Sequence, residues 1–196
     1  MAKLIQQEEW EAIYSGDSFR NKNLYPSEEI VSFVMRRYGH LKDKSKINIL
    51  DVGCGWGNNL SFFKAQEFSY TGIDFSQSAV DHCLQKHTNV LCAKLTQIPL
   101  PDNEFDLVID RMAIQHNRLE EIKLIFDEVL RVLKPGGVFY SALVESADFQ
   151  VLTTYLQEDQ VRGLAKKFSR CSVDYVIQTD NDQREKMKTN RLLAEK

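Results

Sequence analysis

The sequence predicts an α/β fold built around a doubly wound, mostly parallel β-sheet. From residue 46 onward, short apolar runs that suit buried strands alternate with longer segments that suit helices, which is typical of a parallel sheet covered on both faces. The first of these strands ends at Asp51 and leads into a turn with glycine at positions 53, 55 and 57. Because ligands of open α/β sheets bind beyond the carboxyl ends of the strands, this turn is predicted to be a ligand site.

Hydrophobic periodicity and turn residues indicate the individual elements. Strands are expected at about 46–52, 69–74, 89–93, 105–110 and 137–144, and helices near 58–66, 76–86, 119–133 and 153–167. Ser76 can cap the second of these helices, and Pro135-Gly136-Gly137 ends the third and turns into the next strand. Two further extended segments are expected near 172–179 and 188–195, joined by the polar residues 180–183.

Residues 1–45 precede the first strand and are predicted to be helical. Trp10, Ile13 and Tyr14 are spaced to share one face of a helix. A second helix is expected to begin near Ser27, because two glutamates follow it where the helix dipole favours negative charge.

Length and composition are those of one ordinary globular domain, with 196 residues, 43% hydrophobic and 27% charged. The net charge of −3 provides no basic field for nucleic acid or an anionic membrane, so neither partner is expected. The four cysteines are scattered without a C-x-x-C pair, which predicts reduced thiols and no metal site. The first residues lack the apolar core of a signal peptide and no run approaches membrane-spanning length, so we expect a cytoplasmic protein. The sequence does not indicate its oligomeric state.

The turn from Asp51 to Asn58, with the sequence DVGCGWGN, discriminates between two classes of cofactor. A dinucleotide fingerprint requires a third glycine at position 58, where this chain has asparagine. Asp51 would also place a carboxylate close to the pyrophosphate. Both features disfavour a nicotinamide-dependent oxidoreductase, and a cofactor with a cationic end fits better.

This turn resembles motif I of the class I S-adenosylmethionine-dependent methyltransferases, whose cofactor carries an ammonium and a sulfonium group and no phosphate. The resemblance covers nearly all of residues 46–196. It implies a Rossmann-like, seven-stranded sheet in a single methyltransferase domain, with an antiparallel C-terminal hairpin and with residues 1–45 as a helical cap. It also implies transfer of a methyl group to a small-molecule acceptor, leaving S-adenosylhomocysteine as the product.

Within the resemblance, Asp74 at the next strand end would accept hydrogen bonds from both ribose hydroxyls, and Phe75 would lie against adenine. Many members of the family have an acid where this chain has Lys94, so adenine would be held by the backbone near Lys94 and Leu95. The cofactor-binding residues implied in this way are Asp51, Gly53, Cys54, Gly55, Gly57, Asn58, Asp74, Phe75, Lys94, Leu95, Asp110 and Arg111.

The run after the fourth strand, residues 108–117, borders the methyl acceptor in the family. His116 is the candidate general base, because an imidazole titrates near neutral pH. Asp110 and Arg111 could orient a polar acceptor or pair with each other, and Glu145 is a weaker candidate of the same kind. In the cap, Trp10, Tyr14 and Tyr25 are candidates to face the substrate, the alternative being that they are packing residues.

Several alternatives stay open. A non-catalytic protein that binds the cofactor or a partner on the same fold is one, because Lys94 departs from the family pattern. A methyltransferase for protein or RNA is less favoured, since the chain shows no added recognition domain. Residues 110–113 also lack the Pro-Pro-aromatic clamp that holds a flipped base. The accepting atom, whether oxygen, nitrogen, carbon or sulfur, is not indicated.

Overall fold

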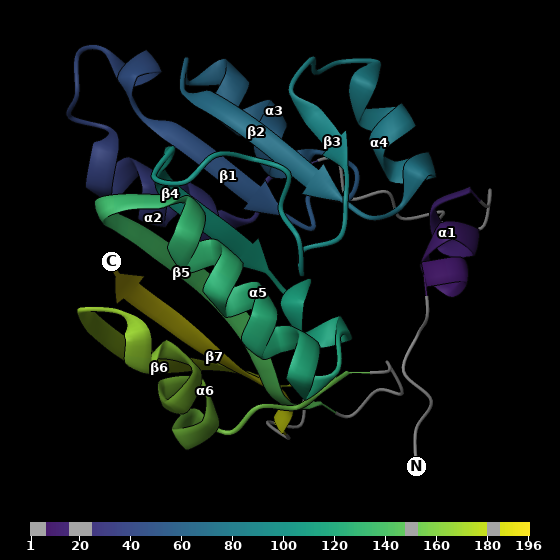
Figure 1. The fold of residues 1–196 in the computed structure, drawn as a ribbon, viewed down its shortest axis with the longest axis vertical. Coiled ribbons are helices and arrows are strands. Elements are labelled where there is room, and N and C mark those ends of the chain that lie inside the picture. Colours follow the sequence, from purple (N-terminus) through teal and green to yellow (C-terminus); the bar gives the residue numbers. More distant parts are fainter. Residues whose placement is uncertain (1–6, 16–24, 148–152, 180–184) are drawn as a thin grey trace. The chain divides into compact units, whose positions relative to one another are not determined.

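The structure, a computed structural model, describes residues 7–15, 25–147, 153–179 and 185–196 (Figure 1). Its strands are β1 (Asn48–Val52), β2 (Ser69–Asp74), β3 (Val90–Cys92), β4 (Phe105–Arg111), β5 (Leu133–Ala147), β6 (Arg170–Thr179) and β7 (Glu185–Glu195). They form a seven-stranded sheet in the order β3-β2-β1-β4-β5-β7-β6. β7 runs antiparallel to β5 and β6, whereas β1 with β2, β2 with β3 and β4 with β5 pair in parallel. The predicted fold class is confirmed, and the polar link at 180–183 lies outside the described residues.

The chain divides into two compact units, one within residues 6–95 and the other within residues 96–196. The first contains β1 to β3, the 3₁₀ turn η1 (Lys44–Lys46) and the helices α1 (Gln7–Ser15), α2 (Glu28–Tyr38), α3 (Asn58–Ala65) and α4 (Gln77–Leu84). Its core includes Ile49, Leu50 and Ile73, all fully buried, as expected for parallel strands covered on both faces. Ser76 caps α4 as predicted, since its Oγ accepts from Ala79 N at 3.2 Å.

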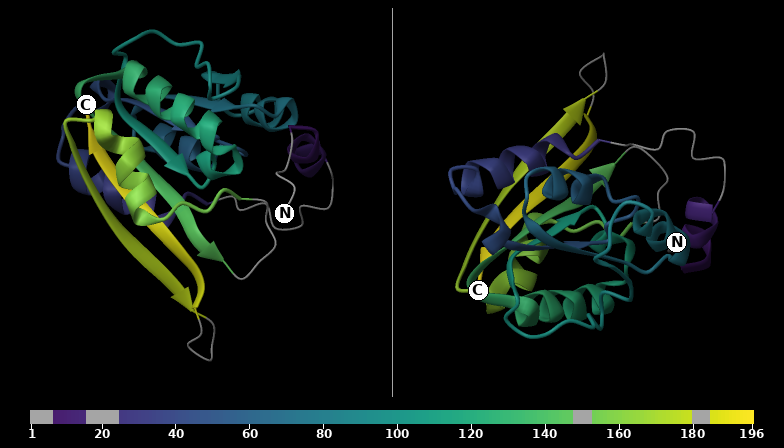
Figure 2. Two further views of the ribbon diagram at one scale, coloured as in Figure 1. Left: turned by 60° about the horizontal axis from the view of Figure 1, so that its bottom comes forward. Right: turned by 90° about the horizontal axis from the view of Figure 1, so that it is seen from above.

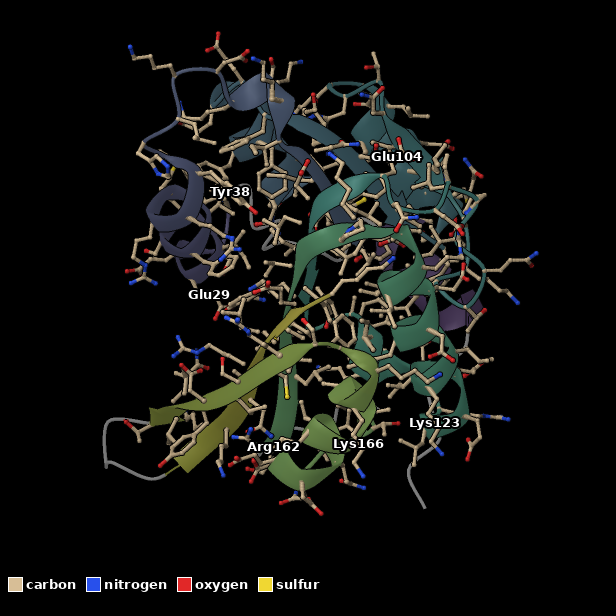
Figure 3. The ribbon with its side chains drawn as sticks, turned by 60° about the vertical axis from the view of Figure 1, so that its left-hand side comes forward. Glu29, Tyr38, Glu104, Lys123, Arg162 and Lys166 are labelled. Carbon is tan, nitrogen blue, oxygen red and sulfur yellow. The ribbon has the colours of Figure 1, made fainter. Side chains whose placement is uncertain are left out.

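The second unit contains β4 to β7, the helices α5 (Leu119–Val132) and α6 (Glu158–Leu164), and the 3₁₀ turns η2 (Ile114–His116) and η3 (Ala165–Lys167). The Phe139 ring of β5 contacts Phe126 of α5 and Phe168 beyond η3, with ring centroids 5.4 and 6.1 Å apart. Both helical segments therefore cover one face of the β5-β7-β6 strands (Figure 2). Arg162 and Lys166 lie on the exposed outer side of this layer (Figure 3).

Two predicted boundaries in the second unit differ from the structure. The helix expected at 153–167 begins only at Glu158, because Thr154 N donates to the Gln115 carbonyl (2.8 Å) and not to a helical partner. β5 begins at Leu133, earlier than expected, and pairs there with Phe105 before its register shifts. Gly136, with φ 77°, lies within the irregular stretch that the sequence suggested would be a turn. Among the described residues, no helix is both long and apolar enough to cross a membrane.

Candidate functional site

The glycine turn after β1 is held against β2 by main-chain hydrogen bonds. Gly53 N and Cys54 N both donate to the Ile73 carbonyl, at 2.7 and 3.0 Å. The φ angles of Gly53, Gly55 and Gly57 are 71°, 51° and 75°, a left-handed region that glycine enters without strain. Gly57 is the N-cap of α3, which begins at Asn58 as predicted.

Close contacts on the turn explain why it excludes side chains. A Cβ at Gly57 would lie 2.9 Å from Cys83 Sγ, and one at Gly55 would lie 2.8 Å from the Tyr14 hydroxyl. Cys83 Sγ also donates to the Gly55 carbonyl at 3.1 Å. The neighbouring Cys83 thiol and burial hold the pKa of Cys54 well above its usual range, so Cys54 is a neutral packing residue of the turn.

Two buried carboxylates lie at the ends of the neighbouring strands β1 and β2. Asp51 is 2% exposed and pairs in register with Gly72, two residues before Asp74, which is 3% exposed. Asp74 Oδ2 accepts from Gly55 N and Oδ1 accepts from Ser76 N, both at 2.9 Å. Burial raises the pKa of Asp74 above its ordinary value, while the backbone donors oppose that shift. The structure thus brings together the two acids that the sequence singled out in this unit.

The segment expected to meet adenine lies beside Asp74. Ala93 N donates to the Asp74 carbonyl at 2.9 Å, which fixes the chain immediately after β3. Cys92 Sγ makes a long contact of 3.6 Å with the Phe75 carbonyl. Lys94 is exposed and Leu95 is 8% exposed, so only Leu95 of this pair is part of the core.

Helix α1 is attached to the same unit through Glu11, a residue that the sequence did not single out. The Glu11 carboxylate accepts from the Ser76 hydroxyl at 2.7 Å, from Ser78 N at 3.1 Å and from the Ser78 hydroxyl. These hydrogen bonds, with that from Ser76 as the largest cause, lower the pKa of Glu11. α1 is therefore held at the N-terminus of α4, directly after Asp74.

The aromatic residues of the N-terminal region divide into two groups. Trp10 stacks on Tyr14 (5.9 Å between centroids), and Tyr14 contacts Trp56 of the glycine turn (5.7 Å). Burial raises the pKa of Tyr14 far above its ordinary value, so its hydroxyl stays neutral beside Gly55. Tyr25, in contrast, is 77% exposed. Trp10 and Tyr14 thus cover the turn, and Tyr25 does not belong to this contact.

In the second unit, Asp110 at the end of β4 organises the loop that follows. Its Oδ1 accepts from Ala113 N and Ile114 N at 2.9 and 3.1 Å, and its Oδ2 accepts from the Ser141 hydroxyl at 2.6 Å. The side chain is fully buried, and burial raises the pKa of Asp110 to about 6. Both oxygens therefore contact this unit's own β4–η2 loop and β5.

The 3₁₀ turn η2 carries His116 and is tied to β5 and to the segment before α6. Gln115, which is 3% exposed, accepts from Val144 N through its side chain (2.7 Å) and from Thr154 N through its carbonyl (2.8 Å). Met112 precedes this turn with φ 59°, a strained conformation for a residue with a Cβ. His116, half-buried, therefore lies on a loop that hydrogen bonds hold to β5 and to the segment before α6.

The two remaining candidates of the second unit differ in their surroundings. Glu145 forms an ion pair with Lys188 of β7 at 2.7 Å, and the two side chains are 12% and 25% exposed. Arg111 is exposed, and its Nη1 lies 3.7 Å from Met112 Sδ. Glu145 is therefore part of an enclosed pair, and Arg111 is part of the surface.

Three comparisons with known proteins agree on the class of the chain. Residues 50–141 match the family model described as a methyltransferase domain. A fatty-acid O-methyltransferase from Mycolicibacterium smegmatis is 29% identical over 128 residues, which cover 59% of this chain and 45% of that protein. A tRNA N(3)-cytidine methyltransferase from Gallus gallus is 30% identical over 104 residues, covering 46% and 28%. A solved S-adenosylmethionine-dependent methyltransferase from Archaeoglobus fulgidus has a TM-score of 0.69 at 15% identity, over 95% of this chain and 98% of that one.

Residues 50–141, which contain the glycine turn, match a methyltransferase domain, in agreement with the resemblance that the turn suggested. The chain spans less than half the length of the two curated relatives named above, at 45% and 28%. The names of those relatives refer to acceptors as different as a fatty acid and a tRNA, so the similarity alone does not identify the acceptor.

Proposed function

We propose that this protein binds S-adenosylmethionine at the strand ends of β1 and β2 and transfers its methyl group to a small-molecule acceptor. The cofactor assignment rests on the hydrogen bonds that the Asp74 carboxylate accepts. Each of its carboxylate oxygens accepts one backbone hydrogen bond, from Gly55 N and from Ser76 N. Because an ionised carboxylate has about four acceptor sites, roughly two remain for the two hydroxyls of a ribose.

The rest of this strand end also fits the cofactor. Asp51 places a second buried carboxylate beside the glycine turn, which suits the cationic methionine end and opposes a pyrophosphate. The left-handed φ angles of Gly53, Gly55 and Gly57 turn the chain sharply beside Asp51, and the ligand would lie against this main chain. Phe75 and Leu95 offer the apolar contacts for adenine, while the exposed Lys94 side chain has no acceptor for its amino group.

In the reaction, the bound cofactor supplies a methyl group already activated on a positively charged sulfur. The protein then has to align the acceptor atom about 3 Å from the methyl carbon, in line with the bond that breaks. We assign to His116 the removal of a proton from a hydroxyl or ammonium acceptor, the proton passing to an imidazole nitrogen. Asp110 and Gln115 hold the His116 loop in place, and Trp10 and Tyr14 of the cap shield the glycine turn from water.

A small-molecule acceptor is supported by the net charge of −3, which gives a polyanion no general attraction. Residues 1–45 are proposed to act as the cap of a methyltransferase domain at 46–196, since Glu11 fastens α1 next to Asp74. The four free cysteines suit a reducing compartment, which favours the cytoplasm.

Incubation of the full chain with radiolabelled methyl donor and a fractionated extract of cell metabolites tests the proposal. Label should appear in a small-molecule fraction, and S-adenosylhomocysteine should suppress it. Label confined to RNA or protein would overturn the small-molecule assignment. Cofactor binding without transfer to any fraction would instead support the second candidate, a non-catalytic binding protein on this fold.

A further inference from the structure

Three side chains from different elements form a hydrogen-bonded network that ends at Gly57 of the glycine turn. The Tyr70 hydroxyl of β2 lies 3.0 Å from Nδ1 of His87, a residue that follows α4. Nε2 of the same ring lies 3.3 Å from the Ser61 hydroxyl of α3. The Ser61 hydroxyl donates in turn to the Gly57 carbonyl at 3.1 Å. We name Ser61, Tyr70 and His87 the His87 network.

His87 also packs directly against the turn. Its side chain is 4% exposed, and a Cβ at Gly57 would lie 3.3 Å from Cδ2 and 3.4 Å from Nε2 of the ring. Gly57 is the N-cap of α3, and its carbonyl also accepts from Ser61 N at 3.0 Å. The network therefore supports the residue at which the glycine turn becomes helix.

One arrangement of protons makes all three hydrogen bonds of the network. The Gly57 carbonyl can only accept, so the Ser61 hydroxyl proton points to it and the Ser61 oxygen accepts from His87 Nε2–H. Nδ1 of His87 then carries no proton and accepts from the Tyr70 hydroxyl. The network thus requires a neutral imidazole in its Nε2–H tautomer.

The surroundings of His87 favour this neutral ring. Burial, followed by the positive charges of Lys64 and Lys86, lowers the pKa of His87 below its ordinary 6.5. Lys64 of α3 is held beside the ring's own segment, because its Nζ donates to the Lys86 carbonyl at 2.7 Å. On β2, burial raises the pKa of Tyr70, and on α4 the Cys83 thiol donates to a carbonyl of the turn, so neither brings a negative charge to the ring.

From these contacts we infer that His87 is a positioning residue of the proposed cofactor site. Through Ser61 and by direct packing, the neutral ring holds Gly57 at the φ of 75° with which the turn enters α3. S-adenosylmethionine would lie against this main chain, so a turn that leaves this conformation lowers the affinity by the fraction of time it is elsewhere. The inference rests on the proposed function and adds a residue that acts on the cofactor through the turn.

The variant Tyr70→Phe tests the network without removing the ring that contacts His87, whose centroid lies 5.7 Å from that of Tyr70. Calorimetry of the full chain should show S-adenosylhomocysteine binding about three- to tenfold more weakly, the range for one neutral hydrogen bond. Tyr38→Phe is the matched control, because it removes a hydroxyl of α2 that accepts from Arg37 Nε at 3.2 Å. Its affinity should stay within about twofold of wild type.

The imidazole ¹⁵N signals of His87 give a readout that packing alone would not move. In wild type at pH 7.5 they should show the proton on Nε2 and none on Nδ1. In Tyr70→Phe, Nδ1 loses its donor, so both tautomers should be present. Wild-type protein with the proton on Nδ1 would overturn the inference.

Two substitutions of His87 separate positioning from the filling of space. Glutamine can donate an amide N–H to Ser61 as Nε2–H does, whereas leucine fills a similar volume without a donor. His87→Gln should bind S-adenosylhomocysteine within about threefold of wild type at pH 7.5, and His87→Leu should bind about tenfold or more weakly. Equal affinities of the leucine variant and wild type, or no recovery of affinity by glutamine, would contradict a positioning role.

The pH profile isolates the charge on His87. Because the folded-state pKa of His87 is below 6.5, the support is complete above pH 6.5 and is lost as pH falls through the folded value. Between pH 7.5 and 5, wild-type affinity should therefore fall about threefold or more beyond the fall seen for His87→Gln. Asp74 titrates in both proteins, so the difference between the profiles belongs to His87, and parallel profiles would overturn the inference.

If His87→Leu does not fold, Ser61→Ala decides together with Tyr70→Phe. Ser61 is exposed and alanine favours a helix, so the stability of Ser61→Ala should not fall, while its affinity for S-adenosylhomocysteine should. Unchanged affinity in both of these variants would remove the role of His87 alone. Failure of wild type itself to bind S-adenosylhomocysteine would remove the proposed function.

Discussion

The two compact units of the chain carry their candidate residues in different ways. Within residues 6–95, most of them come from two short segments, the turn at 51–58 and the strand end at 72–76. Within residues 96–196, the contacts join distant positions, such as Gln115 with Val144 and Asn190 with Leu156. A site formed by one turn and its neighbouring strand end leaves a local sequence signature, whereas contacts between separate strands leave none.

The largest expected effect is on turnover in the second unit. His116→Ala should lower the rate of methyl transfer by roughly 10² to 10⁴, the range for loss of a general base, and leave cofactor affinity unchanged. The loss should shrink as pH rises and the acceptor ionises unaided. Steady-state rates across pH, together with calorimetry of S-adenosylhomocysteine binding, measure both. A mutant-to-wild-type rate ratio that is flat with pH would leave His116 without a role as base.

The next effect concerns the stability of the first unit. Gly57→Ala introduces a Cβ at φ 75° and 2.9 Å from Cys83 Sγ, so the free energy of unfolding should fall by about 2 to 4 kcal/mol. Gly163→Ala in α6 is the control, since a Cβ there meets nothing within 4 Å and should stabilise the helix slightly. Urea unfolding of both variants gives the comparison. Equal stabilities would show that the glycine turn is less tightly packed than we describe.

The third effect, slightly smaller in free energy, is on the affinity for the cofactor. Asp74→Ala should weaken S-adenosylhomocysteine binding by about 1.5 to 3 kcal/mol, the range for hydrogen bonds to a charged group. Asp81→Ala serves as the control, because that exposed acid of α4 bonds only Gln77 among the hydrogen bonds described for this helix. If the folded Asp74→Ala protein bound S-adenosylhomocysteine as tightly as the Asp81→Ala protein, the ribose assignment would be wrong.

The smallest effect is a pH dependence of stability in the second unit. The pKa of Asp110 is about 6 in the folded protein against an ordinary 3.8, so between these values the folded state keeps a proton that the unfolded state releases. The stabilisation is complete below about pH 4 and is lost as pH rises through 6. Relative to Asp110→Asn, wild type should therefore lose on the order of 2 kcal/mol between pH 4 and 7. If the free energies of unfolding of the two proteins changed equally between pH 4 and 7 in urea denaturation, this prediction would be refuted.

The sequence predicted the fold class and the glycine turn after β1 because both depend on local patterns. Burial on both faces gives β1 its apolar run, and left-handed φ angles at the turn require glycine. Glu11 was not predicted as a site residue, since its partner Ser76 is 65 positions away and no spacing connects them. Residues 153–157 were predicted as helix because the competing bond from Thr154 N to Gln115 is formed only in the folded chain.

The central claim is that the strand ends carrying Asp51 and Asp74 bind S-adenosylmethionine and its product and not a dinucleotide. Isothermal titration calorimetry of the full chain with S-adenosylhomocysteine and with NAD tests it most directly. We predict saturable binding of S-adenosylhomocysteine and no heat of binding with NAD, because Asp51 opposes a pyrophosphate and Asn58 replaces the third dinucleotide glycine. Measurable NAD binding that competes with S-adenosylhomocysteine would contradict the claim.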